Sequence, residues 1–282
     1  MPLTQEEIKE LHKKSQEIRK RIVEITYSAG GGHIGGSLSE TDVLVALYYK
    51  YLNIDPSRAH WEDRDRMILS KGHGGIGWAA ILGDKGYFDK TLLKDFNKTG
   101  SPFGMHLDSL KVPGCDASTG SLGHGLAIAL GLALGARLKG KSWHTYVMLG
   151  DGECCEGSVW ESAAIVAHHK LDNLTGFVDR NKLMIDGPTE EITTLEPLEE
   201  KFRVFGWEAL RIDGHDFTQI GDAIEKARAT KGKPTMIICD TIKGKCVDFM
   251  ENDYKWHYGG INSDMVDTAV KSIDSYYQKI LG

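Results

Sequence analysis

Two polar residues separated by one strand–helix–strand interval form the strongest chemical feature of the sequence. Asp151 follows the apolar stretch Tyr146–Leu149 within a Gly-Asp-Gly triplet, and Asn181 lies 30 residues further on (181 − 151). A helix and a second apolar stretch, Thr175–Val178, fill the interval, so both side chains can reach neighbouring strand ends of a parallel sheet. A carboxylate, an amide oxygen and a nearby carbonyl are hard oxygen ligands suited to Mg²⁺ or Ca²⁺. The pattern predicts a divalent-cation site.

Glycines around this aspartate favour a phosphate-containing ligand bound through the same cation. Gly150 and Gly152 allow the backbone to approach an anion closely, and the start of the following helix adds a favourable dipole. The alternative is purely structural: a tight strand–helix turn with a capping Asp151 and a buried Asn181. The asparagine at crossover distance and the strand–helix–strand setting favour the ligand-binding interpretation.

The elements that must position these residues alternate between strand and helix. Strands are expected at Arg66–Leu69, Tyr146–Leu149, Thr175–Val178, Glu208–Ile212 and Thr235–Cys239. Helices are expected after Thr4, from Ser37 to Leu52, after Gly74 as far as Leu82, and at Gly123–Leu138, Ser158–His169 and Thr218–Ala229. This alternation indicates an α/β fold with a doubly wound, mostly parallel sheet flanked by helices. No repeat or linker divides residues 1–282, so we expect a single domain.

Capping signals mark the starts of the first two helices. Thr4 and Glu7 have the spacing of a capping box, and apolar residues recur at helical intervals after them. A glycine cluster at positions 30–36 then ends the first helix. Ser37 also has a glutamate three residues later, which predicts that the second helix begins at Ser37.

Composition excludes several classes of protein. The 282 residues are 41% hydrophobic and 26% charged, which is ordinary for a soluble globular protein with a sizeable core. No apolar run approaches the ~20 residues of a membrane span, and the charged N-terminus is unlike a signal peptide. Five scattered cysteines fit neither a disulfide framework nor a paired zinc site, which indicates a reduced, cytoplasmic setting. The formal charge of −6 argues against nucleic acid or an anionic membrane as partner.

The segment from GDGECCEGSVWE to DRNKLMIDG resembles the thiamin diphosphate motif of transketolases. Five further motifs match that family in order: SAGGGHIGGSLS, LSKGHG, SPFGMHLD, STGSLGHG and KGKCVDFMENDYKWHYG. The resemblance covers essentially the whole chain and implies the N-terminal, thiamin-diphosphate-binding part of a transketolase. It implies transfer of a two-carbon ketol unit between sugar phosphates. Pentose phosphates are the default substrates, but two-subunit relatives that act on branched or unusual sugars would have the same sequence features.

The resemblance also implies roles for individual residues. Asp151, Asn181 and the Leu183 carbonyl resemble the metal ligands. The residues that resemble further cofactor contacts are Lys71, His73, Gly120, Ser121, Leu122, Gly152, Lys243 and His257. Ile185 resembles the apolar residue beneath the thiazolium ring.

Histidines and one glutamate complete the implied site. His33, His73, His106 and His257 resemble histidines that contact the diphosphate or the sugar hydroxyls and relay protons, a role suited to a near-neutral pKa. The match at His106 is looser, because GMHLD departs from the shorter GHP-like form. Glu156 resembles a glutamate that faces the dimer partner and joins a carboxylate network; the alternative is a first-turn helix residue. Four other histidines are expected to be structural or exposed: His60, His144, His168 and His169. His124 stands where the family usually has glutamine.

A second polypeptide is also implied. Transketolases use a glutamate of a pyrimidine-binding domain, further along the chain, to activate the cofactor. Residues 1–282 stop after the diphosphate-binding part, so we expect a C-terminal transketolase subunit with pyrimidine-binding and C-terminal domains, unless the chain is a truncated piece. Two copies of each subunit would then form a heterotetramer.

Other classes are less well supported. Two literal Gly-x-Gly-x-x-Gly matches suggest a nicotinamide dehydrogenase, but the one at 30–35 follows a helix, and the one at 72–77 has no clear acidic strand end about 20 residues later. Chains of 1-deoxyxylulose-5-phosphate synthase and 2-oxoacid dehydrogenase E1 share the core from Gly-Asp-Gly to the asparagine. The KGKCVDFMENDYKWH segment and the histidines favour transketolase over both. A non-catalytic cofactor-binding scaffold stays open.

Overall fold

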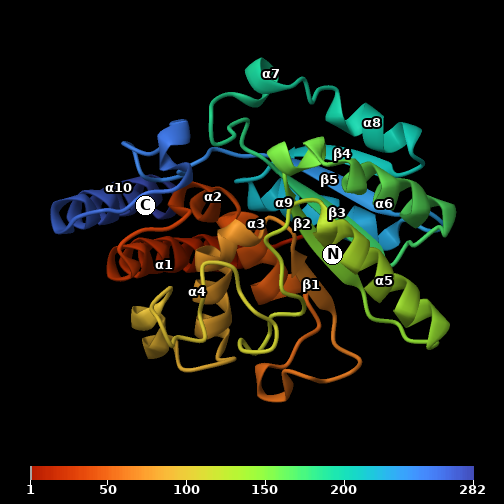
Figure 1. Ribbon diagram of the computed structural model, residues 1–282, viewed down its shortest axis with the longest axis horizontal. Coiled ribbons are helices and arrows are strands. Elements are labelled where there is room, and N and C mark those ends of the chain that lie inside the picture. Colours follow the sequence, from red (N-terminus) through yellow and green to blue (C-terminus); the bar gives the residue numbers. More distant parts are fainter. Residues whose placement is uncertain (1) are drawn as a thin grey trace.

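The computed structural model describes residues 2–282 and is built around a five-stranded sheet (Figure 1). The strands are β1 (Arg66–Leu69), β2 (Thr145–Gly150), β3 (Leu174–Arg180), β4 (Glu208–Asp213) and β5 (Thr235–Asp240). Their spatial order is β1-β2-β3-β5-β4, and every neighbouring pair is parallel. The predicted α/β fold with a parallel sheet flanked by helices is confirmed.

Helices cover both faces of this sheet (Figure 1). One core contains residues of α1 (Gln5–Ala29), α2 (Ile34–Ser39), α3 (Thr41–Ala46), α4 (Gly75–Lys85), α9 (Phe217–Ala229) and α10 (Ser263–Leu281). The other contains residues of α5 (His124–Leu138), α6 (Gly157–His168) and α8 (Leu198–Val204). Because successive strand residues point to opposite faces, Met67 and Leu69 join the first core and Ile68 the second. Burial of both faces explains the apolar runs of β1, β2, β3 and β5, whereas the edge strand β4 is only partly buried and carries charged residues.

The first helix has the predicted start. Thr4 Oγ1 accepts from the Glu7 backbone N–H at 3.3 Å, and the Glu7 carboxylate accepts from the Thr4 N–H at 2.8 Å, which completes the capping box. The helix ends at Gly30, which adopts a left-handed conformation with φ of 74°. Within residues 2–282, no helix is long and apolar enough to cross a membrane.

The second helix differs from the prediction. It begins at Ile34 as α2, and the Ser37 hydroxyl donates to the His33 carbonyl oxygen at 3.0 Å instead of capping a helix. The expected continuous helix to Leu52 consists of α2, α3 and a π-helical turn at Leu47–Tyr51. The capping-box prediction at Ser37 was wrong because Glu40 is fully buried, with its carboxylate 3.1 Å from Lys71 Nζ.

Residues 187–198 lie in the connection between β3 and α8. A short helix, α7 (Thr189–Ile192), lies within it. The buried guanidinium of Arg180, at the end of β3, holds this loop by donating to Thr189 Oγ1 at 2.7 Å, Glu190 Oε1 at 2.8 Å and Glu196 Oε1 at 3.0 Å. These hydrogen bonds hold the loop against the carboxyl end of β3, next to Asn181.

Candidate active site

The carboxyl ends of four strands open into one pocket. Its volume is about 340 Å³, and it lies at the edge where ligands of open parallel sheets bind. The lining residues are His33, Gly36, Lys71, His73, His106, Gly120, Leu122, Gly150, Asp151, Gly152, Glu153, Asn181, Leu183, Met184, Ile185, Asp186, Lys243 and His257. The fold thus brings together residues from positions 33 to 257 that no local pattern connects.

Asp151 and Asn181 take the neighbouring positions that their spacing predicted. Gly150 at the end of β2 is in register with Asp179 of β3, so the two following segments leave adjacent strands. The buried Asp151 carboxylate accepts from the Gly152 N–H at 2.7 Å and from the Lys182 N–H at 2.6 Å. It also accepts from the Arg180 guanidinium at 3.1 Å. Burial raises the pKa of Asp151, and the nearby Asp179 carboxylate adds to that rise.

The oxygen atoms at this edge fit a divalent cation shared with a diphosphate. Asp151 offers a carboxylate, Asn181 an amide oxygen and Leu183 a backbone carbonyl, and all three residues line the pocket. Among residues 2–282, no group of three or more His, Cys, Asp and Glu side chains is arranged to hold a metal ion. Mg²⁺ is commonly bound through one or two carboxylates, with phosphate oxygens completing its shell. The donor set therefore suits a cation that arrives with its anionic ligand.

Two buried lysines carry the positive charge of the pocket. Lys71 Nζ donates to the Gly36 carbonyl at 2.9 Å and to Asp179 Oδ2 at 2.5 Å. Burial lowers the pKa of Lys71, but Asp179 and Glu40 outweigh this effect, so its pKa is raised overall. Lys243 Nζ donates to the Leu183 carbonyl oxygen at 2.8 Å. Burial and the nearby charge of Lys71 lower the pKa of Lys243 to about 8. Both cations face the space where an anion would lie.

Four histidines gather beside these lysines in the pocket, and His257 Nδ1 lies 3.1 Å from Lys243 Nζ. The ring centroids of His33, His73 and His257 lie 5.2–5.3 Å apart, and the ring of His106 lies 6.1 Å from that of His33. Burial lowers the pKa of His33 to about 4, and burial with the neighbouring Lys243 lowers that of His257 to about 3. For His33 and His257 these pKa values lie below the near-neutral range expected from the resemblance, because desolvation disfavours the charged imidazolium.

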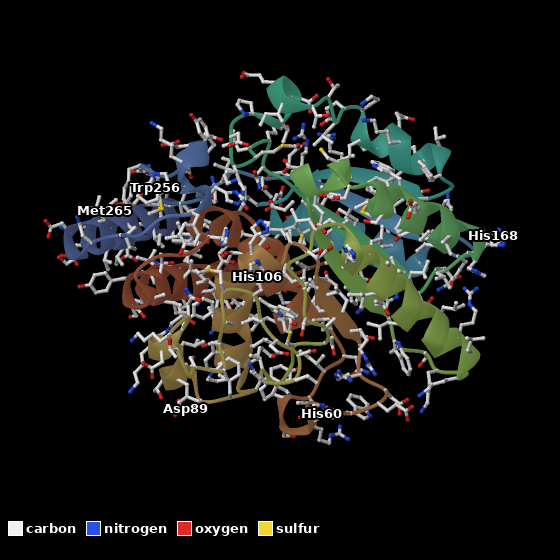
Figure 2. All side chains as sticks on the ribbon, viewed as in Figure 1. His60, Asp89, His106, His168, Trp256 and Met265 are labelled. Atoms are coloured by element: carbon white, nitrogen blue, oxygen red, sulfur yellow. The ribbon has the colours of Figure 1, made fainter. Side chains whose placement is uncertain are left out.

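A glycine makes room for one of these rings. Gly120 has φ of +138°, and a Cβ atom there would lie 2.7 Å from the His106 ring. In Figure 2, His106 lies near the middle of the view, whereas His60 and His168 lie at the periphery. His60, His168 and His169 are exposed, as expected, and His144 is partly buried with Nε2 2.8 Å from Thr175 Oγ1.

Two residues of the predicted site do not line the pocket. Ser121 is exposed, although its neighbours on both sides reach the wall. Glu156 is also exposed and directly precedes α6. It lies close to Gly123, since a Cβ atom added at Gly123 would be 2.6 Å from the Glu156 Cβ. Gly150, which the sequence indicated as a place where the backbone approaches an anion, lines the pocket. Sequence reasoning missed Gly36, Glu153, Met184 and Asp186, of which Glu153 follows the Gly-Asp-Gly triplet directly.

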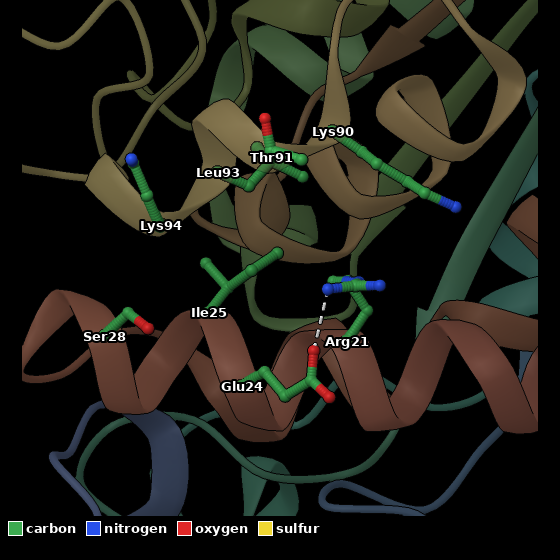
Figure 3. A pocket seen from close by; sticks show the side chains of 8 residues that line it. All are labelled: Arg21, Glu24, Ile25, Ser28, Lys90, Thr91, Leu93 and Lys94. Carbon is green, nitrogen blue, oxygen red and sulfur yellow. Dashed lines mark ion pairs between the residues drawn. The ribbon is translucent and has the colours of Figure 1, made fainter.

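A second cleft, between α1 and the segment Lys90–Asp95, differs in chemistry (Figure 3). Its volume is about 120 Å³, and its lining residues are Arg21, Glu24, Ile25, Ser28, Lys90, Thr91, Leu93 and Lys94. Arg21 is already paired with Glu24 at 2.8 Å. This cleft has no glycine-rich strand end, and its one carboxylate, Glu24, is held by Arg21, so the strand-end pocket is the candidate active site.

Comparison with known proteins decides the family. The model described as "Transketolase, thiamine diphosphate binding domain" matches residues 11–275. The chain belongs to the transketolase family. A 6-deoxy-6-sulfo-D-fructose transketolase subunit of Clostridium sp. (strain MSTE9) is 43% identical over 265 residues, which cover 94% of this chain and 96% of that subunit. An apulose-4-phosphate transketolase subunit of Phocaeicola vulgatus is 37% identical over 274 residues, which cover 97% of each.

Solved transketolases share the fold but are longer. The Campylobacter jejuni transketolase superposes with a TM-score of 0.87 at 28% identity, covering 96% of this chain and 43% of its own. The Leishmania mexicana transketolase gives 0.83 at 28% identity, covering 96% and 46% respectively. This chain therefore spans less than half the length of these two transketolases and nearly the full length of the two transketolase subunits. The predicted family and its transketolase-type enzyme class are confirmed, and the nicotinamide dehydrogenase alternative is excluded.

Proposed function

We propose that this chain is the thiamin-diphosphate-binding subunit of a two-subunit transketolase that transfers a two-carbon ketol unit between sugar phosphates. The observation that carries the proposal is the strand-end pocket, where an oxygen donor set, two buried lysines and four histidines converge. The match to relatives named as transketolase subunits, over nearly their whole length, supports the same conclusion. Pentose phosphates remain the default substrates, as in the pentose phosphate pathway.

The diphosphate end of the site is assigned to the sheet edge. Asp151, Asn181 and the Leu183 carbonyl would hold Mg²⁺ (or Ca²⁺), and Lys71 and Lys243 would face the diphosphate oxygens. The backbone of Gly152 and of the Gly120–Leu122 turn lies at the same wall. When bound, thiamin diphosphate supplies the nucleophilic carbon and the electron sink that ketose cleavage requires. Ile185, which is 63% exposed at the pocket mouth, offers an apolar surface for the thiazolium ring.

The histidines are assigned to the sugar. His33, His73, His106 and His257 present neutral imidazoles, each of which can donate at one ring nitrogen and accept at the other. Such rings can orient sugar hydroxyls and move a proton between substrate oxygen and protein while the carbon skeleton changes. His33 Nδ1 is buried and has no hydrogen-bond partner within residues 2–282, so the other ring nitrogen, Nε2, is the one assigned to a substrate hydroxyl.

A partner subunit would supply the remaining wall of the site. It would carry the pyrimidine-binding and C-terminal domains, including the glutamate that activates the cofactor. The surface of α5 and α6 is consistent with burial against another chain: Ala127 and Gly131 are exposed there, Leu138 is 79% exposed and Ile165 47%. Glu156, exposed between these helices, would face that partner. Two copies of each subunit would give a heterotetramer, in a reducing cytoplasm that suits the five unpaired cysteines.

The experiment is a transfer assay on the co-purified pair of subunits with Mg²⁺ and thiamin diphosphate. Ketose phosphate donors and aldose phosphate acceptors are supplied, and mass spectrometry measures products that are two carbons longer than the acceptor. Product formation that requires both metal and cofactor supports the proposal. Cofactor-dependent decarboxylation of a 2-oxoacid without ketol transfer would overturn it.

A further inference from the structure

Glu153 is a buried carboxylate in the pocket wall to which the site described above gives no role. It lies in a 3-10 turn (Gly152–Cys155) directly after β2, and it is 2% exposed. Its carboxylate accepts from three donors. The Ser70 hydroxyl and the Gly123 N–H (2.8 Å) donate to Oε1, and the Gly150 N–H (2.9 Å) donates to Oε2.

Each of these donors belongs to a different segment of the pocket. In chain order they are Ser70, which precedes Lys71; Gly123, which follows the Gly120–Leu122 turn; and Gly150, which precedes Asp151. Ser70 and Gly123 lie 83 and 30 residues from Glu153 along the chain. One side chain therefore connects the end of β1, the start of α5 and the end of β2.

The donors have few other ways to be satisfied. Gly123 is the N-cap of α5, which has no side-chain capping bond of its own, and the N–H groups at a helix start lack partners within the helix. A buried N–H that loses its acceptor costs free energy. The three segments therefore keep the spacing at which all three donors reach the Glu153 carboxylate. Bonds to a carboxylate are also stronger than those between neutral groups.

We propose that Glu153 is a positioning residue that holds these three segments at the spacing required by thiamin diphosphate and its metal. The inference rests on the proposed function, because the segments matter as a set only if they bind that cofactor. A negative charge at this place repels a diphosphate. The same charge attracts the metal ion and Lys71, so the readout that separates positioning from charge is amide hydrogen exchange of the three segments in the absence of cofactor. Burial raises the pKa of Glu153, and the bonds from Ser70, Gly150 and Gly123 counteract part of that rise.

The test replaces the carboxylate by its amide. Glu153→Gln keeps the shape but places an NH₂ group where one oxygen stood, so at least one of the three donors faces another donor. We expect the affinity of the full-length chain for thiamin diphosphate in the presence of Mg²⁺, measured by equilibrium dialysis, to fall about 10- to 100-fold. Amide hydrogen exchange should rise together around Gly123 and Gly150 in the cofactor-free variant.

Asp65→Asn is the matched control. Asp65 is 7% exposed and accepts from the Asn53 N–H at 2.9 Å and the His144 N–H at 2.8 Å, at the opposite end of β1 and β2. It should lower the stability of the fold without changing cofactor affinity. If Glu153→Gln does not fold, Ser70→Ala takes its place, with a severalfold loss of affinity expected.

The outcomes separate the two levels of the proposal. Unchanged or tighter binding by Glu153→Gln would overturn the positioning role, since it would mean that the charge only repels the diphosphate. An equal loss in Asp65→Asn would also overturn it, because the effect would then be one of global stability. If the wild-type chain alone binds no cofactor, affinity is measured on the co-purified pair of subunits, because the partner is proposed to complete the site. Absence of binding by that pair counts against the proposed function, whereas unchanged exchange around Gly123 and Gly150 in Glu153→Gln counts against the positioning role.

Discussion

Helix α5 approaches the end of β1 most closely at Gly125, and the substitution Gly125→Ala tests this contact. A Cβ atom at this position would lie 2.3 Å from Ser70 Oγ, 2.4 Å from Ser70 Cβ and 2.7 Å from Ser70 Cα. Because Cα is a backbone atom, no side-chain rotation can relieve the overlap. Favourable carbon–carbon contacts begin near 3.5 Å, so α5 must shift by roughly 1 Å.

The expected cost follows from this overlap. Forcing extra volume into a packed interior destabilises by about 1–3 kcal/mol, and contact with backbone places Gly125→Ala in the upper part of that range. Gly131→Ala, on the same helix, is the control because no atom lies within 4 Å of its Cβ position. Alanine is favoured over glycine inside a helix by about 0.5–1 kcal/mol, so this variant should be more stable than the wild type.

Urea unfolding followed by circular dichroism measures both free energies of unfolding. The two variants should differ by roughly 2–3 kcal/mol, the cost of the overlap, because the gain in helix propensity is common to both. Because Ser70 also donates to Glu153, Gly125→Ala should in addition weaken thiamin diphosphate binding, whereas Gly131→Ala should not. A difference below about 1 kcal/mol between the variants would refute the close approach of α5 to β1.

Three further predictions concern the site and its titrating groups. Asp151→Ala should abolish Mg²⁺-dependent thiamin diphosphate binding while the circular dichroism spectrum is kept; equal cofactor affinity in variant and wild type would remove Asp151 from the metal ligands. His257→Ala should retain the cofactor but lose ketol transfer by about 10²- to 10⁴-fold in the assembled enzyme, and unchanged turnover would return His257 to a structural role. Burial lowers the pKa of His144 to about 3. Between about pH 6.5 and pH 3, the unfolded chain therefore binds a proton that the folded chain does not. As the pH is lowered through this range, the free energy of unfolding falls by up to about 1.4 kcal/mol per pH unit for this group. His144→Phe should reduce that slope in urea unfolding at about pH 7 and pH 5, and an identical slope would contradict the assignment.

Local patterns were sufficient for the sheet and for the residues at its edge. Strands β1, β2, β3 and β5 are buried on both faces, so their apolar runs end at glycine or a polar residue, and their limits can be read to within one or two positions. The edge strand β4 is only partly buried and has a mixed sequence. Asp151 and Asn181 could be paired because a parallel crossover brings consecutive strands side by side. The other pocket residues came from resemblance to transketolases, and most of them line the same cavity.

Long-range contacts account for what could not be predicted. Glu40 has the spacing of a helix-capping residue, and only the arrival of Lys71 from another segment explains its burial. Glu153 stands inside the most visible motif, yet its partners come from positions 70, 123 and 150. The lowered pKa of His257 follows from desolvation and from the nearby Lys243, neither of which is encoded by neighbouring residues.

Dependence on a second chain is the central claim, and one assay addresses it directly. The purified chain is supplied with Mg²⁺, thiamin diphosphate and a ketose–aldose phosphate pair, and ketol transfer is measured before and after addition of the C-terminal transketolase subunit. We expect no transfer by the chain alone, because the glutamate that activates the cofactor is assigned to the partner, and full activity once the pair has assembled. Substantial turnover by the chain alone would contradict the two-subunit account.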